Sequence, residues 1–358
     1  MGIVEFALGA ALVGVVLNDV FSTVIVPRPT PSRFRPAALL TRFGWRGWRA
    51  RFGAVTPPQQ RERRMGIFAP LIVMALLATW ILMLITGYGL MFDAVRDSLR
   101  PSPDSLGTSL YFAAVSLLTI GYGDYVATDG LARVVAIAAA GTGLGVVALT
   151  ITYLFSLYAN LERREILVAT LDARAGAPPS GVRLLERCAE LGLRGDLERI
   201  FQRWEEWSAE MLESHVAYPI LMFFRSSHDN ESWVSALGAI LDSATLVETT
   251  TQDVPSGQAQ MTRAIGAHVV EDLARFLRVP RTATVGIERV EYEQARERLL
   301  AVGYALRPAE QGWRDFQAAR SAYAGDLNGL ATFFAVPPAL WIGDRTAVPH
   351  AAVGQPAT

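Results

Sequence analysis

Hydrophobic residues are concentrated in the first half of this chain of 358 residues. Two stretches, residues 65–92 and 134–161, contain no charged residue at all, and a third apolar stretch lies at 3–26. At about 1.5 Å per helical residue, each is long enough to cross a hydrocarbon layer of about 30 Å. The pattern therefore excludes a purely soluble protein. The predicted membrane-spanning helices are residues 1–26, 66–92 and 131–160.

A shorter apolar segment, LGTSLYFAAVSLL at 106–118, lies between the second and third spans. It follows a polar segment at 93–105 that contains two prolines, and it runs directly into TIGYGD at 119–124. It is too short to cross a bilayer but suits a re-entrant helix, which enters and leaves on one side. We expect a re-entrant helix at 106–118.

The rest of the chain has apolar residues at helical spacing, and the alternation typical of strands is scarce. Nothing interrupts the helical pattern between Leu131 and Ala173, so the last span is expected to continue beyond the membrane. We predict an all-α domain at 161–342 and a disordered tail at 343–358. Helical patterns within this domain cover about 181–216, 229–250, 257–278, 288–302 and 308–335.

The charges predict the orientation in the membrane. Residues 27–65 contain ten arginines and one acid, Glu62, which marks this segment as cytoplasmic by the positive-inside bias. The N-terminus is then outside the plasma (inner) membrane and the C-terminus is cytoplasmic. The single cysteine, Cys188, excludes an internal disulfide and hence a secreted disulfide scaffold.

An interfacial helix is predicted inside the arginine-rich segment. Its apolar face would present tryptophans as membrane anchors, and the adjoining arginines would lie near anionic lipid headgroups. A voltage sensor would need arginines at every third position of a full-length apolar span, and this stretch is too polar and too short. The apolar positions are Thr41, Trp45, Trp48 and Phe52, and the arginines are Arg42, Arg46 and Arg49.

The segment after the re-entrant helix carries the candidate chemistry. It reads Thr119, Ile120, Gly121, Tyr122, Gly123 and Asp124. With the half-length helix before it and spans on both sides, it resembles the selectivity filter of the potassium channel family, in its bacterial form with a single pore loop. The resemblance implies that the backbone carbonyls of Thr119 to Tyr122, with the Thr119 hydroxyl, bind K+. The two glycines accept backbone dihedrals that other residues resist. Tyr122 is expected to brace the filter against the re-entrant helix.

Two positions near the filter depart from the family pattern. Val115 stands where a glutamate is often found behind the filter, and Leu118 stands where a second threonine often precedes the filter threonine. A buried carboxyl pair with Asp124 is therefore not expected. We expect the hydroxyl of Tyr111 to hold Asp124 instead.

A second copy of the short pattern, TGYG at 86–89, lies near the end of the second span. It lacks the residue between threonine and glycine, and no half-length helix precedes it. It is interpreted as a run of small residues with an interfacial tyrosine.

The third span has a glycine cluster. Gly143 follows the filter glycine Gly123 at the distance along the chain where the family often carries a hinge glycine. Gly141 and Gly145 form a GxxxG pair, which is typical of close helix packing. Hinge and packing remain open as interpretations. In the same register, the inner pore would be lined by Thr142, Val146, Thr150 and Tyr153 or by neighbouring positions.

Other candidate residues have simpler interpretations. Asp19, next to Asn18 inside the first span, is more simply a structural partner of a basic residue or a neighbouring helix than a functional acid. His268 and Glu271 could share a helix face as metal ligands, although a solvated face is favoured. Trp204 and Trp207 are expected to pack helices together.

One pore loop supplies a quarter of a pore, so the resemblance implies a homotetramer that conducts K+ passively. Its expected fold is all-α, with an extra N-terminal membrane helix and a helical cytoplasmic domain that lacks the GxGxxG pattern of a nucleotide-binding fold. We expect gating through that domain, an unidentified cytoplasmic ligand, and no enzymatic activity, organic cofactor or nucleic acid. A K+ uptake transporter would need four filter repeats, and a membrane-anchored sensor or enzyme would need a catalytic constellation in 161–342. Neither pattern is present in the sequence.

Overall fold

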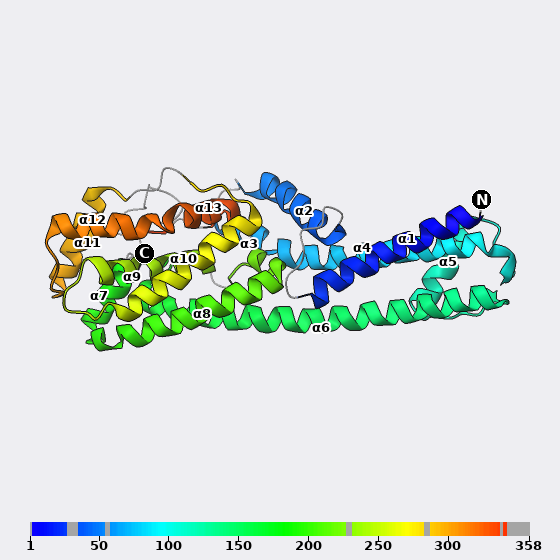
Figure 1. The fold of residues 1–358 in the computed structure, drawn as a ribbon, viewed down its shortest axis with the longest axis horizontal. Coiled ribbons are helices and arrows are strands. Elements are labelled where there is room, and N and C mark those ends of the chain that lie inside the picture. Colours follow the sequence, from blue (N-terminus) through cyan, green and yellow to red (C-terminus); the bar gives the residue numbers. More distant parts are fainter. Residues whose placement is uncertain are drawn as a thin grey trace, which may run out of the picture. The chain divides into compact units, whose positions relative to one another are not determined.

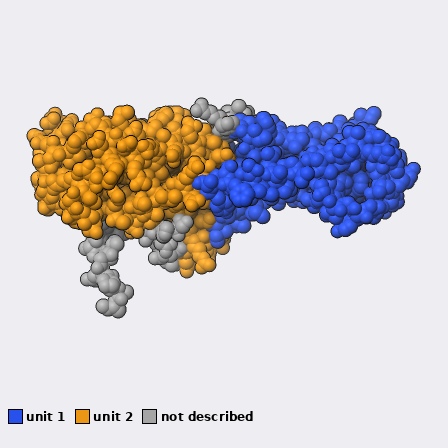
Figure 2. Space-filling model, turned by 90° about the horizontal axis from the view of Figure 1, so that it is seen from below, with its two compact units in different colours: residues 1–50, 67–159 blue, residues 51–66, 160–358 orange. Residues whose placement is uncertain are grey.

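The structure is a computed structural model that describes residues 2–26, 35–53, 58–226, 231–282, 287–336 and 339–341. Helices dominate it, and the described residues form two compact units (Figures 1 and 2). Unit 1 comprises residues 1–50 and 67–159, and unit 2 comprises residues 51–66 and 160–358. Three helical segments are long and apolar enough to cross a membrane, as predicted: Gly2–Ile25, Gln60–Ala94 and Gly130–Ala175. This is an all-α multi-pass membrane protein.

Unit 1 contains the elements expected around the pore loop. α5 is a 12-residue helix whose N-cap residue, Ser105, accepts a hydrogen bond from the Thr108 amide. β1 (Leu99–Arg100) pairs antiparallel with β2 (Val126–Ala127), so the segments before and after the pore loop are held together. The helices of this unit are α1 (Gly2–Val20, extended by a π-helical turn, Phe21–Ile25), α2 (Pro36–Phe52), α4 (Phe68–Ala94), α5 (Leu106–Leu117) and the first part of α6 (Gly130–Ala175).

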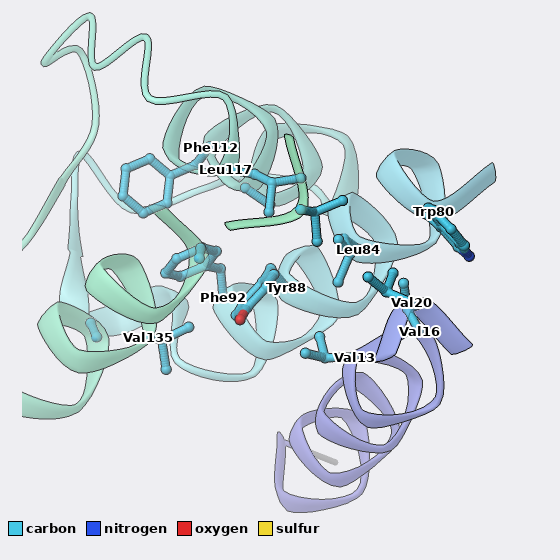
Figure 3. Packing of buried hydrophobic residues seen from close by; sticks show 14 of the residues in the cluster. Val13, Val16, Val20, Trp80, Leu84, Tyr88, Phe92, Phe112, Leu117 and Val135 are labelled. Carbon is cyan, nitrogen blue, oxygen red and sulfur yellow. The ribbon is translucent and has the colours of Figure 1, made fainter. Parts of the chain in front are cut away.

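The core of unit 1 lies where α4 meets α1, α5 and α6 (Figure 3). Phe92 of α4 packs edge to face on Phe112 of α5, with ring centroids 4.7 Å apart. The remaining core is aliphatic, apart from Tyr88 and Trp80 of α4. Residues of the core that Figure 3 labels include Val13, Val16, Val20, Leu84, Leu117 and Val135.

The TGYG copy in α4 is a helix-packing site. A Cβ on Gly87 would lie 3.0 Å from the Gly9 carbonyl oxygen of α1, and a Cβ on Gly89 would lie 2.5 Å from the Leu110 side chain of α5. Tyr88 is only 3% exposed, and its hydroxyl is 2.7 Å from the Thr142 hydroxyl of α6. The small residues admit neighbouring helices, and the expectation of an interfacial tyrosine is wrong, because Tyr88 is buried between helices.

Asp19 joins three helices of unit 1. Its carboxylate accepts hydrogen bonds from the Trp80 indole and the Ala37 amide, each at 2.9 Å, and pairs with Arg35 at 3.4 Å. A buried carboxylate needs such donors because it has lost its hydration. The structural interpretation of Asp19 is confirmed.

The predicted arginine-rich helix is present as α2, but its Trp45 does not face outward. Trp45 is only 3% exposed and packs edge to face on Phe68 of α4, with ring centroids 5.0 Å apart. The Trp48 ring lies 6.1 Å from the same phenylalanine. The expectation of a membrane anchor is therefore wrong for Trp45, because α4 takes up the face that carries it; Trp48 is partly buried, and its anchoring role stays a prediction.

Unit 2 is built around α9, which is buried along nearly its whole length and has a mostly apolar sequence. α7, α10, α12 and α13 cover it. The other elements are α3, α8, α11, the second part of α6 and short 3₁₀ turns. The helices are α3 (Pro58–Gly66), α7 (Gly181–Glu190), α8 (Leu197–Ala217), α9 (Trp233–Thr249), α10 (Gly257–Leu277), α11 (Arg289–Ala301), α12 (Ala309–Ser321) and α13 (Ala324–Phe334).

Two predicted helices of unit 2 are each divided in two. The segment 181–216 breaks after α7, where Gly192 adopts a φ of +70° and ends the helix as a left-handed cap. The segment 308–335 breaks at Tyr323, whose buried hydroxyl donates to Asp242 at 2.7 Å. α6 runs unbroken from residue 130 to residue 175, as predicted. The predicted tail at 343–358 lies outside the described residues.

The minor candidates of unit 2 have structural contacts. Trp204 and Trp207 are buried with ring centroids 4.8 Å apart, which confirms their packing role. His268 lies 3.4 Å from Asp272, and Glu271 pairs with Arg275, on an exposed face. Among the residues that the structure describes, no group of three potential metal ligands occurs.

Candidate ion-conduction site

The loop at 119–124 has an unusual backbone. φ is positive at every second residue: +54° at Thr119, +64° at Gly121 and +79° at Gly123. In an ordinary strand successive carbonyls point to opposite sides, whereas alternation of right- and left-handed residues places successive carbonyls on one side and amides on the other. Glycine adopts these values without a Cβ penalty, whereas the left-handed conformation of Thr119 costs about 1–2 kcal/mol. A backbone of this kind suits a row of carbonyl ligands.

The pore helix, α5, leads into this loop through specific hydrogen bonds. The Thr119 amide donates to the Ser116 carbonyl at 3.1 Å, and the Ile120 amide donates to the Val115 carbonyl at 2.9 Å. These bonds satisfy carbonyls at the C-terminal end of α5 that would otherwise lack partners. They also set the direction in which the chain leaves the helix, so the strained Thr119 conformation is held by its neighbours.

The hydroxyl of Tyr111 in α5 donates to Oδ2 of Asp124 at 2.8 Å. This bond ties the end of the loop back to the helix that precedes it, and it is the contact expected from the sequence. Val115 is buried and offers no polar group, so the pairing of Asp124 runs through a tyrosine. The following turn is fixed as well, because Asp129 binds Ser98 and caps α6 by accepting from the Ala132 amide.

The loop lies at the surface of the single chain. Tyr122 is 70% exposed, so its side chain points outward from the single chain, and its bracing role stays a prediction. A Cβ placed on Gly121 or Gly123 would meet no described atom within 4 Å beyond its neighbours in the chain. The side of the loop opposite α5 is therefore open in one protomer.

Gly143 packs on the end of the pore helix. A Cβ at this position would lie 1.8 Å from the Leu117 carbonyl oxygen, so only glycine lets α6 approach α5 there. A Cβ on Gly141 or Gly145, in contrast, would have no described atom within 4 Å outside the backbone of α6 itself. The close-packing glycine within the chain is therefore Gly143 and not the GxxxG pair. The hinge role of Gly143 stays a prediction.

The four residues expected to line the inner pore face the interior of their own chain. Val146, Thr150 and Tyr153 are buried, and Thr142 bonds to Tyr88. The expectation is wrong for these four residues because the helix turns them toward the core, whereas the neighbouring positions Val147 and Ile151 are exposed. The exposed apolar face of α6 has the spacing i, i+3, i+7 and i+11, which is one side of a helix. It consists of Leu144, Val147, Ile151 and Phe155.

Sequence reasoning did not single out this exposed face because α6 is apolar on all sides of its membrane part. A helix of that kind carries no periodic signal that separates a core face from a pore or lipid face. The core side of α6 is identified by the close approach of Gly143 to α5 and by the buried positions around it, and both depend on where α5 lies.

Comparison with known proteins supports the assignment of this region. Residues 71–160, which cover most of α4, all of α5, the loop and the membrane part of α6, match a family model described as an ion channel. An uncharacterized membrane protein of Bacillus subtilis, YdjJ, is 23% identical over 209 residues, which is 57% of this chain and 58% of that protein. The match thus spans less than two thirds of the relative. No solved structure matches the chain.

Proposed function

We propose that this chain, in which residues 71–160 form an ion-channel domain, conducts K+ passively across a membrane. The observation that carries the proposal is the TIGYGD loop, with its alternate positive φ angles, directly after a half-length helix. Carbonyls of Thr119, Ile120, Gly121 and Tyr122 would replace the hydration shell of K+, which passes through as the permeant ion. The proposal assigns the chain no enzymatic activity and no organic cofactor.

The pore of this proposal is a homotetramer. One loop offers carbonyls from one side only, and a ring of ligands requires closed rotational symmetry. Two exposed features support assembly: the open side of the loop and the apolar face of α6, Leu144 to Phe155. Four copies would bring both features to a common axis, where that apolar face lines the inner pore.

The proposed orientation places the N-terminus outside and the C-terminus in the cytoplasm of the plasma membrane. It rests on the ten arginines at 27–65. It also requires the re-entrant helix to enter from outside, so that the glycine end of the filter faces outward. Accessibility of single cysteines to an impermeant reagent, introduced at Ser102 and at Arg199 in a Cys188→Ser background, tests it.

Anionic lipid headgroups are the proposed partner of α2. Arg42 and Arg46 are exposed, and Phe43 between them is 61% exposed, so cationic and apolar groups share one outward side. Each arginine near an anionic surface contributes about 1 kcal/mol. Replacing Arg42, Arg46 and Arg49 by glutamine should reduce the phosphatidylglycerol retained through purification. The matched control replaces the exposed arginines Arg199, Arg275 and Arg289.

Flux of Rb+ and Na+ into liposomes that contain the purified protein tests the main proposal. Rb+ uptake that exceeds Na+ uptake and is blocked by external barium is expected. Gly121→Ala should abolish it, because a non-glycine residue resists φ of +64° although space for the methyl is free. Gly107→Ala, in the exposed first turn of α5, is the control. Equal Rb+ and Na+ uptake would contradict K+ selectivity, and the absence of any uptake would contradict the channel.

A further inference from the structure

A short segment of unit 2, residues 218–226, contacts the cytoplasmic continuations of two membrane helices. We call it the strap; it contains the 3₁₀ turn Pro219–Phe223. The first contact is with α6. Arg164, which is 3% exposed, donates from Nη1 to the Leu221 carbonyl and from Nη2 to the Phe224 carbonyl, each at 2.9 Å. One guanidinium thus binds the middle of the turn and the residue that follows it.

The surroundings of Arg164 complete this contact. His215 Nε2 lies 3.3 Å from Arg164 Nη1, and His215 Nδ1 is 2.9 Å from the Met211 carbonyl. Because the carbonyl accepts from Nδ1–H, Nε2 is left to accept from the guanidinium, so the histidine is neutral. The Arg164 carbonyl in turn accepts from the Trp207 indole at 3.1 Å. α6 is therefore fixed to the strap and to α8 at one residue.

The second contact is with α3. Arg225, at the end of the strap, donates from Nη1 to Glu62 Oε2 at 2.7 Å, and both side chains are largely buried. Nη2 of Arg225 donates to the carbonyls of Phe334 and Ala335, where α13 ends. A cation is favourable there because the last carbonyls of a helix lack partners. α3 ends at Gly66, and α4 begins at Phe68.

We propose that the strap mechanically couples the cytoplasmic end of α6 to α3, the helix that precedes α4, with Arg164 and Arg225 as the positioning residues. This proposal rests on the proposed channel function. α6 is one continuous helix across the boundary at residue 160, so displacement of its cytoplasmic end is carried toward the pore. The strap passes that displacement to α3, and the carbonyls at the end of α13 connect it to the rest of unit 2.

Amide hydrogen exchange tests the strap without requiring conduction, because it reports local opening of each helix. Arg164→Gln removes the α6 contact and leaves every residue of α3 and of the strap unchanged. We expect faster exchange in residues 58–66 of this variant, by at least about fivefold. Arg289→Ala, which removes an exposed ion pair to Glu310 in the same unit, should leave that segment unchanged. Unchanged exchange at 58–66 in Arg164→Gln would overturn the proposal.

Single-channel recording tests the consequence for gating. Glu62→Ala removes the α3 half of the pair, together with the longer contact of Glu62 to its neighbour Arg61 at 3.8 Å, and leaves the carbonyl contacts of Arg225 in place. We expect it to change the ratio of open to closed time by at least about fivefold, the lower range for linked sites, with unchanged selectivity for Rb+ over Na+. In the double variant with Arg225→Ala, the effect should equal that of Arg225→Ala alone, because the two residues act through one contact.

The two failures are distinguishable. If the wild-type protein conducts K+ and neither Glu62→Ala nor Arg289→Ala changes the ratio of open to closed time, the strap proposal is overturned and the channel proposal stands. A wild-type protein that conducts nothing would overturn the proposed function, and the exchange experiment would still decide whether the strap joins α6 to α3. Additive effects of Glu62→Ala and Arg225→Ala would also overturn the proposed route, because they would assign the residues to separate contacts.

Discussion

Gly143→Ala places a methyl group where α6 meets the end of the pore helix. The new Cβ would lie 1.8 Å from the Leu117 carbonyl oxygen, whereas such contacts do not fall below 3.0 Å, so the two helices must separate. Overpacking of this kind costs about 1–3 kcal/mol. The higher helix propensity of alanine offsets about 1 kcal/mol of this cost, so the free energy of unfolding should fall by up to about 2 kcal/mol. Because Leu117 lies two residues before Thr119, the displacement reaches the filter, and we expect reduced K+ selectivity.

Thermal unfolding in detergent and reversal potentials in mixed K+ and Na+ measure the two effects. Gly141→Ala and Gly145→Ala are matched controls, since their new methyl groups would have no described atom within 4 Å outside the backbone of α6. They should keep wild-type selectivity and be as stable as wild type or up to about 1 kcal/mol more stable. If Gly143→Ala instead kept wild-type selectivity and stability and changed only the open probability, the packing argument would be refuted in favour of the hinge.

Three further predictions concern single side chains. Burial, and then the adjacent Arg164, lower the pKa of His215 well below 6.5. Below pH 6.5 the unfolded chain therefore takes up a proton at this histidine that the folded chain excludes, and the free energy of unfolding should fall as the pH drops. Thermal unfolding against pH checks this, and His215→Gln should flatten that dependence. Trp80→Phe removes one donor from the buried carboxylate of Asp19 and should cost about 1–3 kcal/mol in thermal unfolding; wild-type stability would contradict it. Tyr111→Phe should accelerate the decay of K+ current at low external K+, because Asp124 loses its tether; an unchanged decay would show that the bond does not support the filter.

The helices that cross the membrane were predictable because their evidence is local. An uncharged stretch as long as residues 65–92 has few alternatives to a spanning helix. The re-entrant helix followed from its length, and the glycines of the loop from the backbone that carbonyl ligands require. The breaks of unit 2 were less predictable: Tyr323, which lies between α12 and α13, bonds to Asp242, which is distant in the sequence.

The sequence predicted less well which face of each helix is buried. Trp45 and Tyr88 were assigned to the membrane interface, yet both are buried against neighbouring helices. Thr150 was assigned to the pore and faces the core. In all three cases the residue type suits either environment, because lipid and protein interior are both apolar and a helix in lipid shows little periodicity.

The sequence by itself determined which segments are membrane helices, where the pore loop lies, and that an intramembrane acid such as Asp19 needs partners. These conclusions depend on length, charge and residue type, which act locally. Only the tertiary structure decided which glycine admits a neighbouring backbone, which side of α6 stays exposed, and that Arg164 and Arg225 meet one strap. Those choices depend on close packing and buried hydrogen bonds between segments far apart in the chain, and no local pattern encodes them.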